Sequence, residues 1–230
     1  MSRRVCVAKY KVPYLREKVI EEHAQLLLDE WSQEHPAVTE PPVPIDEILE
    51  VGLGLEFKIC DLQSEFGHPD ILGGIWFGAR LVKVDLSLDP KNNPGLLGRY
   101  RFTLAHEVGH WRLHRHHLMD DPATASLFED KDTPAFVCRS SIKPPEEWQA
   151  DQFAACVLMP RRLVFQAWER WRGQIDPASL VELGIDERDE TAMDSFCRPF
   201  AEQFEVSAQA MRIRLQGLGL FVKEKEPRLF

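Results

Sequence analysis

The alternation of apolar and polar positions predicts a chain built mainly of helices, with one short sheet. Residues 14–34 repeat apolar side chains at helical spacing, as in an amphipathic helix. After a proline-rich connection at 36–44, residues 45–51 predict a short helix and residues 55–59 a strand. β-branched and aromatic residues at 74–77 and 81–86 predict a hairpin, whose free edge could bind an extended peptide by strand addition.

Two further helices are expected in the middle of the chain. The first begins near Pro94 and keeps Leu97, Leu104, Val108 and Trp111 on one face. The second spans residues 145–158, because proline is well tolerated at a helix start and Pro160 would stop it. Between them, residues 118–145 form a connection too long for a simple turn, which we interpret as a lid. It contains Cys138, interpreted as a small buried hydrophobe, with a metal-blocking thiol as the alternative.

The C-terminal third predicts a separate helical part. Residues 193–204 and 207–215 indicate a helix, a tight turn and a second helix with Ser207 as its N-cap. The second helix offers only Arg212 and Arg214 to a nucleic acid, so packing or partner docking is favoured over DNA reading. The expected domains are residues 1–172, an acidic linker at 173–191, and a helical extension with tail at 192–230.

Composition narrows the class of protein. The chain has 230 residues, 44% of them hydrophobic and 28% charged, as in an ordinary globular protein. Its net charge of −9 weighs against direct nucleic-acid binding, which relies on Lys and Arg. No apolar run is long enough for a membrane span. Five cysteines without a Cys-x-x-Cys pair indicate reduced thiols, so we expect a cytoplasmic protein without membrane partners.

His106-Glu107-Val108-Gly109-His110 predicts a hydrolytic metal centre on the first of these helices. Residues four apart share a helix face, so His106 and His110 can bind one ion through both imidazoles. Glu107 lies one step round, where a carboxylate suits a base that deprotonates metal-bound water. His114 continues the spacing, but at about 1.5 Å per residue it lies about 12 Å from His106 along the axis and could not share the ion.

The third protein ligand that a catalytic zinc site needs is expected from residues 147–151. Glu147 can reach the ion, while Asp151, four residues on, accepts the spare N–H of a liganding histidine. Glu146 is the competing carboxylate, about 100° away round the helix. His116 and His117 are alternatives that require the first helix to end early.

Two segments resemble the ImmA/IrrE metallo-endopeptidases of bacteria and phages. They are RFTLAHEVGHWRLH at residues 101–114 and EWQADQFAACVLMP at residues 147–160. The resemblance implies that His106, His110 and Glu147 are metal ligands and that Glu107 is catalytic. It also implies an α+β, zincin-like fold, with a small antiparallel sheet packed on the motif helix and a C-terminal helical extension.

The function implied is zinc-dependent cleavage of one regulatory protein, such as a helix-turn-helix repressor or a paired antitoxin. Zinc is expected because His ligands are borderline soft, with Mn²⁺ or Fe²⁺ as alternatives. The competing interpretation is a metal-binding regulatory or toxin–antitoxin module without significant proteolysis. The complete set of His106, Glu107, His110 and Glu147 favours the enzyme, since a scaffold has no use for the base.

Overall fold

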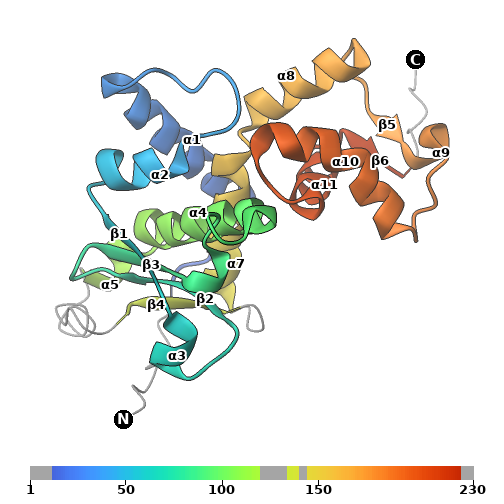
Figure 1. Ribbon diagram of the computed structural model, residues 1–230. Helices are drawn as coiled ribbons and strands as arrows, with labels where there is room; N and C mark the ends of the chain where they lie inside the picture. Colours follow the sequence, from blue (N-terminus) through green and yellow to red (C-terminus); the bar gives the residue numbers. More distant parts are fainter. Residues whose placement is uncertain (1–11, 120–133, 140–143, 224–230) are drawn as a thin grey trace. The chain divides into compact units, whose positions relative to one another are not determined.

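The computed structural model describes residues 12–119, 134–139 and 144–223 (Figure 1). The chain divides into two compact units, one of residues 1–37 with 44–158 and one of residues 38–43 with 159–230. The first unit therefore ends at residue 158, before the boundary at 172 expected from the sequence. None of the described helices is long and apolar enough to cross a membrane.

The first unit combines a small sheet with a layer of helices. Its elements are α1 (Glu17–Glu34), α2 (Ile45–Glu47), the π-helical η1 (Ile48–Gly52), β1 (Glu56–Cys60), α3 (Leu62–Phe66), β2 (Ile71–Trp76), β3 (Leu81–Asp85), the 3₁₀ turns η2 (Leu86–Leu88) and η3 (Pro94–Leu96), α4 (Leu97–Leu113), α5 (Arg115–Met119), β4 (Phe136–Arg139) and α7 (Pro145–Leu158). The strand order is β1-β3-β2-β4.

The sheet is mixed, which refines the expected all-antiparallel sheet. β2 pairs antiparallel with β3 and with β4, whereas β1 pairs parallel with β3. Parallel pairing arises because the chain crosses over through α3 and β2 between these two strands. β4 takes the edge of β2 that the sequence suggested as a free edge for a peptide, so that suggestion was wrong. The mixed α/β architecture expected for a zincin-like domain is confirmed.

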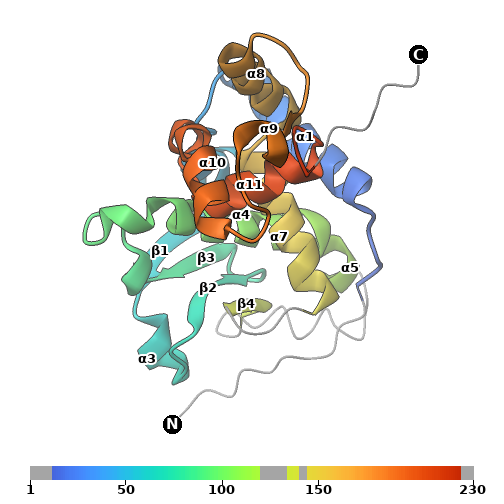
Figure 2. The ribbon, with the colours of Figure 1, turned by 90° about the vertical axis from the view of Figure 1, so that its right-hand side faces the viewer.

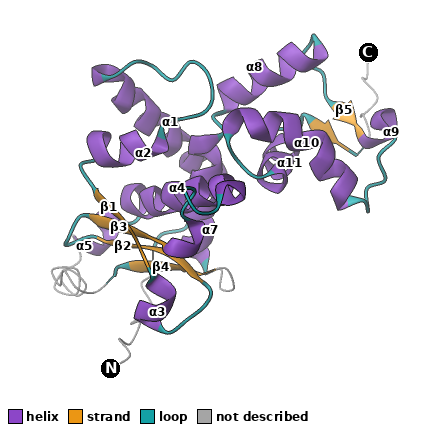
Figure 3. Cartoon of the chain, in the orientation of Figure 1, coloured by secondary structure: helices purple, strands orange, loops and turns teal. Residues whose placement is uncertain are grey.

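Helix α4 packs against α7 and against strands β2 and β3 of the sheet (Figures 2 and 3). Twelve of its seventeen residues are buried, so it is a central element rather than a surface helix with one apolar face. α7 packs against α4 on one side and α1 on another. Gly109 permits the close approach, because a Cβ there would lie 3.1 Å from the Ala150 Cα atom.

The described part of the lid segment supplies strand β4. Its residues 120–133 and 140–143 lie outside the described residues, so the lid itself stays a prediction. Pro145 stands at the first position of α7, as expected, since a proline there sacrifices no helical hydrogen bond.

The second unit consists of α8 (Arg161–Arg172), β5 (Ala178–Ser179), α9 (Leu180–Leu183), α10 (Glu190–Phe204), α11 (Ala208–Gly217) and β6 (Phe221–Val222). An aromatic cluster forms its core, with the rings of Trp168 and Phe200 stacked 5.6 Å apart. The Ser207 side chain accepts from the Ala210 N–H at the start of α11, which confirms the expected N-cap. Residues 173–191, expected as a linker, include β5 and α9.

Candidate metal centre

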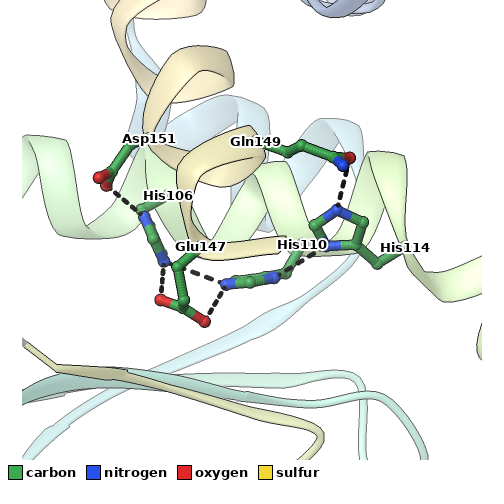
Figure 4. A network of polar contacts seen from close by, with 6 residues as sticks. All are labelled: His106, His110, His114, Glu147, Gln149 and Asp151. Carbon is green, nitrogen blue, oxygen red and sulfur yellow. Dashed lines mark hydrogen bonds and ion pairs between the residues drawn. The ribbon is translucent and has the colours of Figure 1, made fainter. Parts of the chain in front are cut away.

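His106 and His110 direct their imidazoles toward one point beside α4 (Figure 4). Their Nε2 atoms lie 3.0 Å apart, and both rings are buried. The spacing of one helical turn places them on one face, as the sequence predicted. Two ring nitrogens this close cannot both carry a proton, because the two N–H groups would collide.

Helix α7 brings Glu147 to the same point. Its Oε2 atom lies 3.1 Å from His106 Nε2 and its Oε1 atom 3.2 Å from His110 Nε2. One turn further, Asp151 Oδ1 lies 3.0 Å from His106 Nδ1 and accepts the Nδ1–H, so in a neutral His106 the Nε2 atom would be available to a metal. Glu146 is partly exposed, whereas Glu147 is buried.

The donor set fits a divalent cation. In a tetrahedral site with bonds of about 2.0–2.1 Å, ligand atoms lie about 3.3 Å from one another. The separations here are 3.0 to 3.2 Å, so a small outward shift of each side chain would admit the ion. Two imidazoles and one carboxylate are also a ligand set that zinc enzymes use.

The carboxylate of Glu107 is buried beside this group. Neither oxygen has a hydrogen-bond partner within the described part of the chain. Gly73 on β2 makes room for it, because a Cβ at this position would lie 3.0 Å from Glu107 Oε1 and 2.7 Å from Thr103 Cγ2. An unpartnered buried carboxylate is unfavourable unless a cation or proton accompanies it.

A chain of hydrogen bonds fixes the tautomer of His110. The Gln149 Nε2 atom donates to the Pro13 carbonyl at 3.0 Å, so Gln149 Oε1 is left to accept from His114 Nε2 at 3.3 Å. The Nδ1 atom of a neutral His114 must then accept from His110 Nδ1–H, 2.9 Å away. His110 Nε2 is consequently free of a proton and can bind a metal.

The comparison with protein families agrees with this geometry. The model of the IrrE N-terminal-like domain, peptidase family M78, matches residues 96–216, which is more than half of the chain. The chain belongs to this family. A search of curated proteins finds no match. As a member of a metallopeptidase family, the M78 protein is expected to act on protein, and its buried His106, His110 and Glu147 are compatible with a metal ion.

In the metal-free M78 site, burial and neighbouring charges shift the pKa values of the ligand residues in different directions. Burial disfavours a charged His106, but contacts with Cys138, Asp151 and Glu147 outweigh it and raise the pKa of His106 above its ordinary value. Burial lowers the pKa of His110, and it lowers the pKa of His114 to about 3. Burial disfavours ionised Glu147, but its pKa is depressed by charge attraction and hydrogen bonds from His110 and His106. Without a metal, the proton between the two Nε2 atoms therefore belongs to His106.

Burial also raises the pKa of Glu107, to about 8, with the neighbouring Glu147 charge adding to the effect. In the metal-free protein this carboxyl is therefore largely neutral at pH 7. A divalent cation at the histidines would favour its ionised form, because opposite charges stabilise one another at short range.

Strand β4 adds two side chains to the site, Phe136, which the sequence did not suggest, and Cys138, which it suggested only as the alternative interpretation. The Phe136 ring stacks on His110, with centroids 4.0 Å apart and planes 12° from parallel. Cys138 is half-buried, and its Sγ atom lies within 4.8 Å of a ring nitrogen of His106. The structure thus places Cys138 beside the candidate ligands, in contrast to the buried hydrophobe that was favoured from the sequence.

The structure brings together His106, Glu107, His110, Glu147 and Asp151 as the two motifs predicted. His114 lies behind His110 rather than at the Nε2 atoms, in line with the axial distance expected from helix geometry. His116 and His117 are exposed on α5. Sequence reasoning missed Gly73 and Gln149; the pair Gly73-Gly74 at the start of an expected strand was a signal of close packing.

Proposed function

We propose that this M78 peptidase is a zinc-dependent endopeptidase, with His106, His110 and Glu147 as ligands and Glu107 as the general base. The unpartnered, buried carboxylate of Glu107 carries the proposal. A protein that only bound a metal for structure would have no need to keep this costly group next to the ligands. Asp151 would hold His106 in its metal-binding tautomer, and His114 would do the same for His110.

The residues would divide the reaction between them. Zinc would supply Lewis acidity and lower the pKa of its bound water toward about 7. Glu107 would accept the proton of that water and later deliver it to the amine of the leaving peptide. The absence of a side chain at Gly73 would leave room for the carboxylate beside the ligands, and Phe136 on His110 would keep bulk water away from one face of the site.

We further propose a narrow substrate, a regulatory protein such as a helix-turn-helix repressor or an antitoxin. The net charge of −9 supports a basic partner, since opposite charge accelerates association. The free cysteines among the described residues, Cys60, Cys138, Cys156 and Cys197, fit a reducing compartment such as the cytoplasm.

The test is a cleavage assay with three purified, zinc-loaded proteins: the parent chain, Glu107→Gln and Glu146→Gln. The substrates are the proteins encoded by the adjacent reading frames, with denatured casein as a nonspecific control. Glu107→Gln should keep its zinc yet lose two or more decades in rate, about 2.7 kcal/mol of transition-state stabilisation. Glu146→Gln should cleave at the parent rate. A fully active Glu107→Gln protein would refute the assignment of the base.

A further inference from the structure

A cysteine from the edge strand lies beside the candidate metal centre. The Cys138 Sγ atom, a ring nitrogen of His106 and a carboxylate oxygen of Glu107 all lie within 4.8 Å of one another. The three residues come from two elements, β4 and α4, that are separate in the sequence. This group shares His106 with the group of His106, His110 and Glu147.

The sheet register explains why the thiol points at the site. Cys138 is paired with Gly73 across β4 and β2, and side chains of directly paired residues project from the same face. A Cβ on Gly73 would meet Thr103 and Glu107 of α4, so this face is the one that covers the motif helix. Phe136, two residues before Cys138 and hence on the same face, stacks on His110.

The second indication of a ligand at this point is Glu107 itself. Its side chain is fully buried, and its two oxygens lack hydrogen-bond partners among the described residues. A thiol, an imidazole and an unpartnered carboxylate around one space form a set suited to a borderline-soft divalent cation. A thiol that served only for packing would not need these polar neighbours.

We propose that Cys138 is a displaceable protein ligand of the metal, taking the coordination position that substrate hydrolysis requires for water. On ligation the thiol releases its proton to solvent, the sulfur–metal bond forms and the bound water leaves. Nothing is oxidised or reduced, and the reverse exchange restores the water. This inference rests on the metal centre of the proposed function.

Cobalt substitution tests the ligation directly, because a thiolate bound to Co²⁺ gives a near-ultraviolet charge-transfer band. The purified full chain, Cys138→Ser and Cys60→Ser are loaded with Co²⁺ and analysed for metal content and absorbance. Cys60 is the matched control, since it is also half-buried but lies at the end of β1. The band should appear in the parent and in Cys60→Ser and vanish in Cys138→Ser, although that variant still holds about one cobalt.

The outcomes separate the two proposals. A parent protein that binds no Co²⁺ would refute the metal centre and the ligation together. A parent protein that binds Co²⁺ without the band, or a Cys138→Ser protein that keeps it, would refute only the ligation by Cys138.

A second measurement needs no substitution. Zinc should slow the alkylation of Cys138 by iodoacetamide about tenfold or more, read by mass spectrometry of its peptide, while alkylation of Cys60 should not change. Equal alkylation of Cys138 with and without zinc would contradict the proposal. Cleavage should also speed up in Cys138→Ser, since water would then hold the position unopposed, and a slower Cys138→Ser would count against displaceable ligation.

Discussion

Two helix pairs in this chain bury very different interiors. The pair α10 and α11 of the second unit encloses mainly apolar side chains, among them Phe200, Phe204 and Met211. Its buried cation, Arg212, donates to Asp194 at 2.7 Å. The pair α4 and α7 of the first unit also buries apolar side chains, but together with them it buries a set of ionisable and amide side chains, which includes His114 at the end of α4: Arg101, His106, Glu107, His110, His114, Glu147 and Gln149.

The difference indicates that the buried residues of α10 and α11 mainly stabilise their unit, whereas those of α4 and α7 include groups kept for a reaction or a ligand. Apolar burial contributes about 25 cal/mol per Å², so the α10–α11 interior stabilises its unit directly. Buried ionisable groups are favourable only when each has a partner. In the α4–α7 pair the histidines have partners, whereas Glu107 has none among the described residues. A pair that keeps such a group sacrifices stability for a reaction or a ligand.

The largest expected effect comes from removing a ligand contributed by α7. Glu147→Ala should weaken zinc binding by more than about a hundredfold, the upper range for residues that act only behind a ligand. The neighbouring Glu146→Ala should leave zinc affinity unchanged, because that side chain is partly exposed. Competition titration with a chelator measures both. The opposite ranking would move the third ligand by one residue and invalidate the proposed α4–α7 site.

The unfavourable free energy of burying the Glu107 carboxylate can be measured from the pH dependence of protein stability. Burial raises the pKa of Glu107 from near 4.5 to about 8, so in this range the metal-free folded state holds a proton that the unfolded state releases. By linkage, its contribution to stability is present below pH 4.5 and is lost as pH rises toward 8. Between pH 5 and pH 8, the parent should lose stability relative to Glu107→Gln, on the order of a few kcal/mol.

Urea unfolding of both proteins after chelator treatment gives this difference. Both proteins keep His106 and His110, so the difference reports on Glu107 together with its interaction with His106. A stability difference that stays constant from pH 5 to pH 8 would show that Glu107 is not perturbed, and the contrast between the helix pairs would lose its main support.

A smaller loss of zinc affinity is expected for Asp151, which contacts the ligand His106 and is not itself a ligand. Asp151→Asn keeps an oxygen that can accept from His106 Nδ1–H but removes the negative charge that strengthens this bond. Zinc affinity should fall about tenfold to a hundredfold. The exposed Asp29→Asn on α1 is the control for a general change of charge. An unchanged zinc affinity in Asp151→Asn would mean that hydrogen bonding alone orients His106.

The motif residues were predictable because helix periodicity is a local rule. Once residues 97–113 and 145–158 form helices, a spacing of four residues puts His106 beside His110 and Glu147 one turn before Asp151. Proline at position 145 and Ser207 fixed helix starts for the same local reason. Glu147 was proposed from a second local pattern, the carboxylates at 147 and 151 on one helix face, and the resemblance to a family supported it. The packing of α7 against α4, which brings Glu147 to the histidines, is not a local property.

The role of β4 could not be predicted, because strand pairing depends on residues far apart in the chain. Cys138 reaches the site only through its register with Gly73, and a shift of one residue would turn it to the opposite face. The short apolar run at 135–138 gave too little periodicity to separate a strand from a loop. The orientation of the Gln149 amide could not be predicted for the same reason, because it is set by a hydrogen bond to the Pro13 carbonyl, which lies far away in sequence.

The smallest expected effect is a loss of stability when a buried arginine of the α10–α11 pair is replaced. Arg212 and Arg214 were the two candidates for contacting DNA, but Arg212 is buried and paired with Asp194, and the Arg214 Nε atom donates to the Met159 carbonyl at 3.1 Å. Both side chains are thus engaged within their own unit. Arg212→Ala should cost about 1–2 kcal/mol of stability, the range for a partly buried, charge-assisted hydrogen bond.

Urea unfolding of Arg212→Ala measures this cost. The control is Arg198→Ala, which removes an exposed arginine on α10, and its free energy of unfolding should lie within about 0.5 kcal/mol of that of the parent.

The parent chain should show no sequence-specific duplex binding at near-physiological salt, because its acidic balance offers few cations for phosphate contacts. A footprint abolished by Arg212→Ala without loss of stability would assign these helices to DNA recognition. The α10–α11 pair would then be a functional surface, and the contrast with α4–α7 would become one between two kinds of site.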